Sequence, residues 1–86
     1  MPSQNIEKVC SYMIKCQDNR YYVGITKMPD VRKLQHFKGK VDFTRMHKPV
    51  DMKVIAWHES YKFARQYEKY LKKLNTTRKN KIWVTA

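Results

Sequence analysis

The chain has 86 residues, with 19 Lys and Arg against 7 Asp and Glu, and its formal net charge is +12. The length predicts a single domain, residues 1–86, with a modest core, and the charge favours a polyanionic partner, most commonly nucleic acid. An anionic membrane surface is the weaker alternative, because no segment approaches the roughly 18 uninterrupted apolar residues of a membrane-spanning helix.

The amino-terminal segment and the cysteines both indicate an intracellular protein, cytoplasmic or associated with the nucleoid or nucleus. Residues 1–7 contain no basic region followed by an apolar run, so no secretory signal is visible, and we expect a loose lead-in. Cys10 and Cys16 lie on one predicted strand. Their Cα atoms would be roughly 20 Å apart there, too far for a disulfide, so we expect both thiols to be reduced.

A β-hairpin is predicted at the start of the domain. Residues 9–15 and 21–26 are rich in strand formers, and the polar, turn-prone segment 17–20 separates them. Alternate side chains of a strand point to the same face. One face of the first strand therefore carries Cys10, Tyr12, Ile14 and Cys16.

A short helix is predicted after the hairpin. Pro29 suits the start of a helix, Asp30 is acidic in its first turn, and Gly39 is a natural stop. Apolar residues recur every three positions along one side, and we expect this stripe to face the core: Val31, Leu34 and Phe37. The basic segment 40–49 is predicted as a loop.

The second half of the chain predicts one strand and two helices. Residues 52–57 read as a strand that is mostly apolar on both faces apart from Lys53, and Ser60 caps a helix that runs to about Leu74. The threonine pair 76–77 would cap a last short helix through Trp83. The long helix has an apolar side formed by Phe63, Tyr67, Tyr70, Leu71 and Leu74. The order ββαβαα predicts an α+β fold, in which helices flank a small three-stranded antiparallel sheet.

Arg32 and His36 are one helical turn apart, so they share a face of the first predicted helix, offset from its apolar stripe. A guanidinium suits a phosphate because its planar fork offers several donors and keeps its charge. Either residue alone is more often a solvated side chain, so the pair by itself does not identify a site.

Glu68 is the only acidic residue from Ser60 to the carboxyl terminus, in a segment rich in Lys and Arg. It could pair with Lys72 at i+4, a contact worth only about 0.3–0.5 kcal/mol. It could instead bind Mg²⁺, which commonly takes one or two carboxylates and completes its shell with substrate phosphates and waters.

Gly24 stands in the second predicted strand, on the same face as Tyr22. A glycine in a strand loses packing and suggests that another group approaches the backbone closely. A substrate backbone flanked by Tyr12 and Tyr22 would explain the glycine, and a β-bulge is the alternative.

Short motifs run in order along residues 9 to about 84: Cys10-Ser11-Tyr12, Tyr22-Val23-Gly24 followed by Ile25-Thr26, Arg32 through His36, Phe43-Thr44-Arg45, Pro49-Val50, and Glu68 through Leu74. In this order and at these spacings they resemble the GIY-YIG nuclease superfamily, close to its small single-domain bacterial and viral branch. The first triplet keeps only its tyrosine, and Phe43 stands where a tyrosine is common. Ile25 stands where some relatives have Lys, and Lys27 is a candidate substitute.

The resemblance implies a divalent-metal-dependent DNA endonuclease that leaves a 5′-phosphate and a 3′-hydroxyl. Tyr22 would be the general base or would hand on the proton of the attacking water, and Tyr12 would position the water or the phosphate. Arg32 would stabilise the transition-state charge, and His36 would hold a phosphate oxygen or orient its neighbours. Glu68 would bind one Mg²⁺ or Mn²⁺.

A non-catalytic nucleic-acid-binding module that retains the scaffold is the alternative. Both interpretations expect DNA contacts beside the tyrosines, along the basic loop and on the long helix: Gly24, Lys27, Lys40, Arg45, Lys48, Arg65, Lys69 and Lys72. The DNA could be double-stranded, branched or single-stranded, and the protein a monomer or weak homodimer. Asn75 and Asn80 are candidates for a late asparagine that some relatives use.

Overall fold

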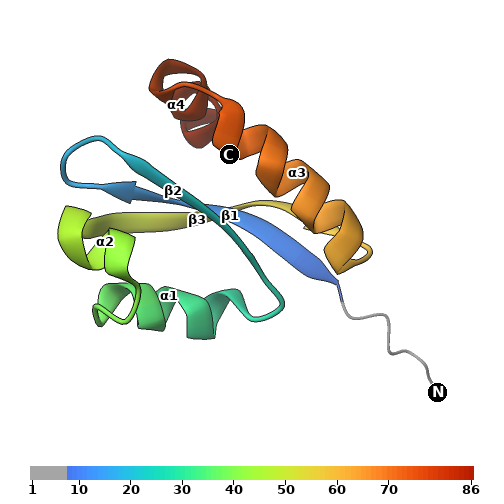
Figure 1. Cartoon of the computed structure of the whole chain (residues 1–86), viewed down its shortest axis with the longest axis horizontal. Helices are drawn as coiled ribbons and strands as arrows, with labels where there is room; N and C mark the ends of the chain where they lie inside the picture. The colour runs from blue at the N-terminus through green and yellow to red at the C-terminus, as the bar shows by residue number, and fades with distance from the viewer. Residues whose placement is uncertain (1–7) are drawn as a thin grey trace.

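The computed structural model describes residues 8–86, so the expectation of a loose segment at 1–7 lies outside the described residues. A three-stranded antiparallel sheet in the order β2-β1-β3 forms its centre, with α1 and α2 on one face and α3 and α4 on the other (Figure 1). The predicted α+β class is confirmed. The elements are β1 Val9–Cys16, β2 Tyr21–Thr26, α1 Pro29–Phe37, α2 Asp42–His47, β3 Pro49–His58, α3 Tyr61–Lys73 and α4 Thr76–Thr85. None of the helices in this described part of the chain has the length and apolarity to cross a bilayer.

Strand β1 is the middle of the sheet and is almost completely buried. It joins β2 through the predicted turn, in which the backbone N–H of Cys16 donates to the carbonyl of Arg20 at 2.8 Å. Asn19 takes a positive φ of 65° there, which asparagine tolerates better than most residues. Cys10 and Cys16 are free and buried, as the strand spacing predicts.

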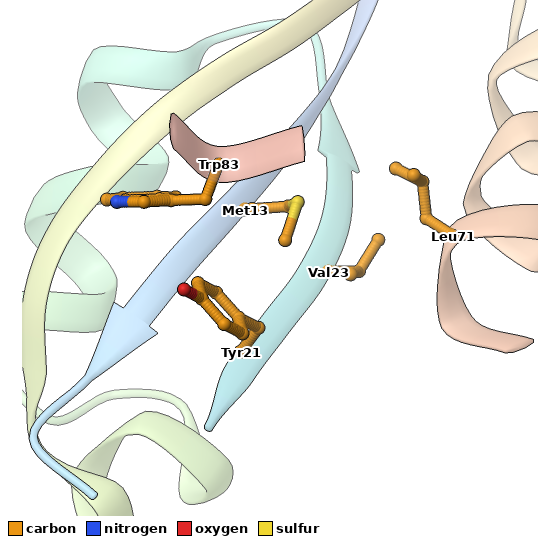
Figure 2. Packing of buried hydrophobic residues seen from close by; sticks show 5 residues of the cluster. All are labelled: Met13, Tyr21, Val23, Leu71 and Trp83. Carbon is orange, nitrogen blue, oxygen red and sulfur yellow. The ribbon is translucent and has the colours of Figure 1, made fainter. Parts of the chain in front are cut away.

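The face under α3 and α4 holds the larger of two hydrophobic clusters (Figure 2), and the opposite face holds a smaller one that includes Ile14 and Cys16 of β1. The buried side chains of the larger cluster come from the hairpin and the two last helices: Met13, Tyr21, Val23, Leu71 and Trp83.

The predicted cap of α3 is confirmed, because the Ser60 hydroxyl accepts a hydrogen bond from the backbone N–H of Phe63 at 3.5 Å. The cap of α4 is Asn75, whose side chain accepts from Arg78 N–H, rather than either threonine that follows. On α3, the predicted apolar side is only partly correct, since Phe63 and Tyr70 are each 53% exposed.

The opposite face shows that the predicted core stripe of α1 is wrong. Val31, Leu34 and Phe37 are 43%, 57% and 41% exposed, whereas His36 is fully buried. The helix is oriented by its polar residues, because His36 and Arg32 meet the hydroxyl of Tyr12, which projects from β1. A buried imidazole with partners on both nitrogens is satisfied, so this contact prevails over a three-residue apolar stripe.

The segment predicted as a loop contains a short helix, α2. Asp42 lies in its first turn and pairs with Arg45 at 2.9 Å, and Thr44 is fully buried against α1. The end of α2 is fastened to the hairpin turn, because Asp18 contacts the His47 ring at 2.6 Å and Gln17 N–H donates to backbone carbonyls at the helix end. Tertiary contacts, which local composition does not reveal, stabilise this short helix.

Strand β3 begins at Pro49, three residues earlier than predicted, and lies at an edge of the sheet. Its apolar residues Val54 and Trp57, which pair with Tyr12 and Cys10 of β1, are 37% and 52% exposed, so the apolar pattern of this strand does not correspond to complete burial. Because β3 is an edge strand, the helices leave these two side chains partly uncovered.

Candidate active site

Two side chains of α1 converge on one hydroxyl of β1. The Tyr12 hydroxyl lies 2.8 Å from His36 Nε2, and Arg32 Nε donates to the same oxygen at 3.3 Å. The i and i+4 spacing on α1 makes this double contact possible. Arg32 also donates through Nη1 to Gln35 at 2.7 Å, which fixes the direction of the guanidinium. Tyr12, Arg32 and His36 therefore form one polar cluster, as the shared helix face predicts.

The environment of this cluster sets its protonation. Burial raises the pKa of Tyr12 to about 12, although the hydrogen bond from Arg32 opposes the rise. Burial, helped by the nearby Arg32 charge, lowers the pKa of His36 to about 4. The hydrogen bond to Tyr12 raises the pKa of Arg32, burial opposes that rise, and the Tyr22 hydroxyl adds to it. At neutral pH the cluster consists of a neutral phenol, a neutral imidazole and a guanidinium cation.

Tyr22 packs over this cluster from β2. Its ring centroid is 4.7 Å from that of His36, edge-on, and 6.2 Å from that of Tyr12. Phe43 of α2 covers its other side, with ring centroids 5.7 Å apart. The phenol is only partly buried. The two tyrosines of the sequence motifs are thus neighbours, but Tyr12 is enclosed and Tyr22 is accessible.

Gly24 lies directly opposite Tyr12 in the β1–β2 pairing. A Cβ at this position would come within 2.5 Å of the Tyr12 hydroxyl oxygen and within 2.6 Å of its ring. The pairing of the two strands is regular here, so there is no bulge. The group that approaches Gly24 is therefore the Tyr12 side chain, which corrects both the substrate and the bulge interpretations. Gly24 is itself buried beneath that ring, so its expected contact with nucleic acid is not supported.

A groove of about 460 Å³ opens beside Arg32, between the end of β2, the start of α1 and the start of α3. Lys27, Arg32, Gln35 and Tyr61 are among its lining residues. Two cations lie near the Tyr61 ring, Lys27 Nζ at 5.1 Å from the centroid and Arg65 Cζ at 5.9 Å. The groove is therefore basic and lies next to the polar cluster.

Glu68 is on α3, the helix that covers the other face of the sheet. Its carboxylate accepts from Lys72 Nζ at 3.4 Å, which is the i+4 pair that the sequence allows, and its side chain is 19% exposed. No group of three His, Cys, Asp or Glu side chains gathers into a metal site within residues 8–86. A cation at Glu68 would consequently take most of its ligands from substrate and water, a donor set that suits Mg²⁺.

The other expected DNA contacts are exposed at several places on the surface. Lys40, Arg45 and Lys48 lie in or beside α2, and the remaining ones lie on α3 or next to the groove: Lys27, Arg65, Lys69 and Lys72. Of the late asparagines, Asn80 accepts a hydrogen bond from Tyr21 at 2.6 Å and belongs to the α4 side. Neither of these asparagines has a contact with the polar cluster in the described hydrogen bonds.

Two contributors to the cluster lie inside the sequence motifs, but no role was predicted for either of them. Gln35 holds Arg32, and its i+3 spacing from the arginine was the available signal. Thr44 contacts His36 Nδ1 at 2.9 Å. Thr44 lies in the segment expected to be a loop, and the acidic Asp42 two residues before it was the only local hint of a helix.

Comparison with known proteins identifies the family of the chain. The GIY-YIG catalytic domain family matches residues 8–82. A UPF0213 protein of Bacillus cereus is 38% identical over 73 residues, covering 84% of this chain and 76% of the relative. A UPF0213 protein of Neisseria meningitidis is 36% identical over 76 residues, covering 87% and 84%. No solved structure matches significantly. Sequence motifs, fold and relatives together place the chain in the GIY-YIG catalytic domain family.

Proposed function

We propose that this protein is a divalent-metal-dependent endonuclease that hydrolyses DNA phosphodiester bonds to 5′-phosphate and 3′-hydroxyl ends. Membership of a nuclease superfamily gives the reaction class. The observation that carries the proposal is the convergence of Arg32 on the Tyr12 hydroxyl at the side of a basic groove, with Tyr22 packed beside it. A phosphate entering this groove would meet the fixed guanidinium of Arg32, which the Tyr22 hydroxyl also contacts.

The two tyrosines have different proposed roles. Tyr12 is fully buried and its pKa is raised to about 12, so it stays protonated and acts as a fixed hydrogen-bonding group. Tyr22 is partly exposed on the same face and can reach water. We assign proton removal from the attacking water to Tyr22. A free tyrosine has a pKa near 10, so it depends on neighbouring cations to act at neutral pH.

Arg32 would bind the scissile phosphate and stabilise the charge that develops in the transition state. Its guanidinium is held at two points, by Tyr12 and Gln35, and its remaining donors are available to a phosphate oxygen in the groove. His36 is fully buried, which favours an orienting role over direct contact with phosphate.

Glu68 would hold the metal ion. It is a half-buried carboxylate surrounded by Lys and Arg, and its partner among the described residues, Lys72, is an exposed ammonium that a divalent ion could replace. A bound Mg²⁺ or Mn²⁺ would neutralise phosphate charge and stabilise the leaving 3′ oxygen. The exposed cations of α2 and α3 would hold the flanking DNA backbone.

A strand-cleavage assay with Mg²⁺ or Mn²⁺ tests the assignment. Tyr22→Phe and Glu68→Ala should each lower the cleavage rate by more than about 100-fold, while the affinity for DNA without metal stays largely unchanged. Tyr70→Phe and Glu59→Ala are matched controls, because both side chains are exposed and lie away from the polar cluster. These two variants should cleave like the wild type. If Tyr22→Phe and Glu68→Ala cleave as fast as their controls, the site assignment is wrong.

The same assay detects a non-catalytic binding module, a role that the Glu68–Lys72 ion pair also permits. In that case the wild type would bind single- and double-stranded DNA with a strong dependence on salt. It would yield no cleavage product with or without divalent metal.

A further inference from the structure

A chain of three buried polar side chains connects α2 to β1 through α1. Thr44, His36 and Tyr12 each have 0% exposure. His36 Nδ1 is 2.9 Å from the Thr44 hydroxyl, and His36 Nε2 is 2.8 Å from the Tyr12 hydroxyl. Both ring nitrogens of the imidazole are thus occupied, one by each neighbour. Neither contact is open to solvent, so water does not decide which atom carries each hydrogen.

The direction of each hydrogen bond in this series of side chains follows from the bond that Thr44 makes to Val41. The Thr44 hydroxyl donates its single hydrogen to the carbonyl of Val41 at 3.3 Å, so toward His36 it acts as an acceptor. Nδ1 of His36 must therefore carry a hydrogen. A neutral imidazole has only one N–H, so Nε2 accepts, and the Tyr12 O–H donates to it. Burial and the Arg32 charge keep the pKa of this imidazole at about 4, so it is neutral at neutral pH.

The opposite direction conflicts with Arg32. If Nε2 of His36 carried the hydrogen, it would donate to the Tyr12 oxygen, and the hydroxyl hydrogen of Tyr12 would have to turn away from His36. Arg32 Nε already donates to that oxygen at 3.3 Å and cannot accept. With the Nδ1–H form, the Tyr12 oxygen keeps its lone pairs for Arg32, and all four groups are satisfied.

We infer that Thr44 is a positioning residue of the proposed nuclease site, which fixes the tautomer of His36 and thereby orients the Tyr12 hydroxyl that holds Arg32. The catalytic consequence rests on the proposed function, but the tautomer is a property of the protein alone. The inference also gives a role to α2, since this short helix places Thr44 against His36.

Nitrogen-15 NMR of the histidine rings in the full chain, without DNA or metal, tests the tautomer directly. The wild type should show His36 as the Nδ1–H form, and Thr44→Ser should retain it because serine keeps the hydroxyl. Thr44→Val should lose the single form, because valine cannot accept from Nδ1. Thr85→Val is the matched control, since the Thr85 hydroxyl bonds only to the backbone of α4 and is exposed; its His36 signal should equal that of the wild type.

Cleavage kinetics supply the second measurement. Thr44→Val should lower kcat by about 10-fold or more, in the range seen for residues that orient site histidines, with little change in KM, and Thr44→Ser should restore kcat. An Nε2–H signal for His36 in the wild type overturns the inference without any variant, even if Thr44→Val does not fold. A wild-type kcat in folded Thr44→Val overturns it as well. A third outcome separates the two proposals. If the wild type shows the Nδ1–H form and Thr44→Val loses it, but neither protein cleaves DNA, then the proposed function fails. The assignment of Thr44 as the residue that fixes the His36 tautomer stands in that case.

Discussion

The two faces of the sheet differ in what they bury, although neighbouring residues of one strand supply both. Met13 of β1 enters an apolar core that Leu71 and Trp83 close, whereas Tyr12, the residue before it, enters a polar cluster with His36 and Arg32. Apolar packing is insensitive to direction, but buried hydrogen-bonding groups must be matched one to one. The α3–α4 face therefore carries the larger apolar cluster, and the α1–α2 face combines a smaller one around Ile14 with hydrogen bonds of fixed direction.

The largest expected effect on stability lies on the apolar face. Leu71→Ala removes a fully buried side chain from the core and should lower the free energy of unfolding by about 2–5 kcal/mol. Leu34→Ala, at a side chain that is 57% exposed on α1, should change it by less than about 0.5 kcal/mol. Urea unfolding followed by circular dichroism measures both values. Equal losses would contradict the division between the faces.

The polar face should make stability depend on pH. The pKa of His36 falls from 6.5 in the unfolded chain to about 4 in the fold, so the unfolded chain binds more protons between these values. The contribution of His36 is complete above pH 6.5 and is lost as the pH falls toward 4, a total on the order of 3 kcal/mol. Urea unfolding at pH 7, 5.5 and 4 should show this loss in the wild type.

Two histidine variants isolate this contribution. His36→Gln removes the group and should flatten the dependence between pH 6.5 and 4, whereas His47→Gln, at a partly exposed ring, should leave the His36 part in place. A dependence that is unchanged in His36→Gln would mean that another group causes it. Tyr12 and Tyr22 are the titratable side chains whose rings contact His36, and the Arg32 charge acts on it from nearby. The pKa of Tyr12 is raised to about 12 and that of Arg32 is raised as well, so neither of these two groups titrates in this range.

Gly24→Ala should disturb the polar face through a single methyl group. The new Cβ would overlap the fully buried Tyr12 ring, and we expect a loss of about 1–3 kcal/mol together with reduced cleavage. Gly39→Ala is the matched control: it places a Cβ at a φ of +77°, which costs about 1–2 kcal/mol, but its nearest neighbour is 3.6 Å away. The control should retain cleavage per folded molecule. Cleavage by Gly24→Ala at the wild-type rate would show that the Tyr12 ring can shift to make room for the methyl group without loss of activity.

The smallest expected effect concerns the side-chain hydrogen bond between Tyr21 of the hairpin and Asn80 of α4. Tyr21→Phe and Asn80→Ala should each cost about 1 kcal/mol, because either change breaks the 2.6 Å contact. The double variant should cost less than the sum of the two, because both changes remove the same interaction. Additive losses would indicate that the contact contributes nothing. Cleavage per folded molecule should be unchanged in all three proteins, because Tyr21 and Asn80 have no described hydrogen bond to the polar cluster or to Glu68.

Local sequence pattern predicts the elements of this fold well where one face is apolar. The alternation in β1 and β2, the turn at 17–20 and the cap at Ser60 are all confirmed. The orientation of α1 was not predictable in this way, because the partner that buries His36 is Tyr12, 24 residues earlier in the chain. The periodicity of a segment reflects only the residues within that segment. It therefore cannot predict a hydrogen bond to a side chain of another strand or helix.

The candidate site also contains features that the sequence predicts and features that it does not. The spacing of Arg32 and His36 correctly predicts a shared face, and the motif order indicates the two tyrosines as neighbours. The reason for Gly24 could not be read from the sequence, because it depends on the register that sets Tyr12 opposite it. Thr44 was missed since its helix is stabilised mainly by contacts with distant residues.

The attachment of α2 to the hairpin turn has a consequence for engineering the protein. Exposed turns are usually the safest sites for a tag or an inserted peptide. Here Gln17 and Asp18 bind the end of α2, the helix that presents Thr44 to His36. An insertion at this turn would loosen that helix while the sheet could still form, so a fusion protein made there would fold and yet lose the geometry of the proposed site.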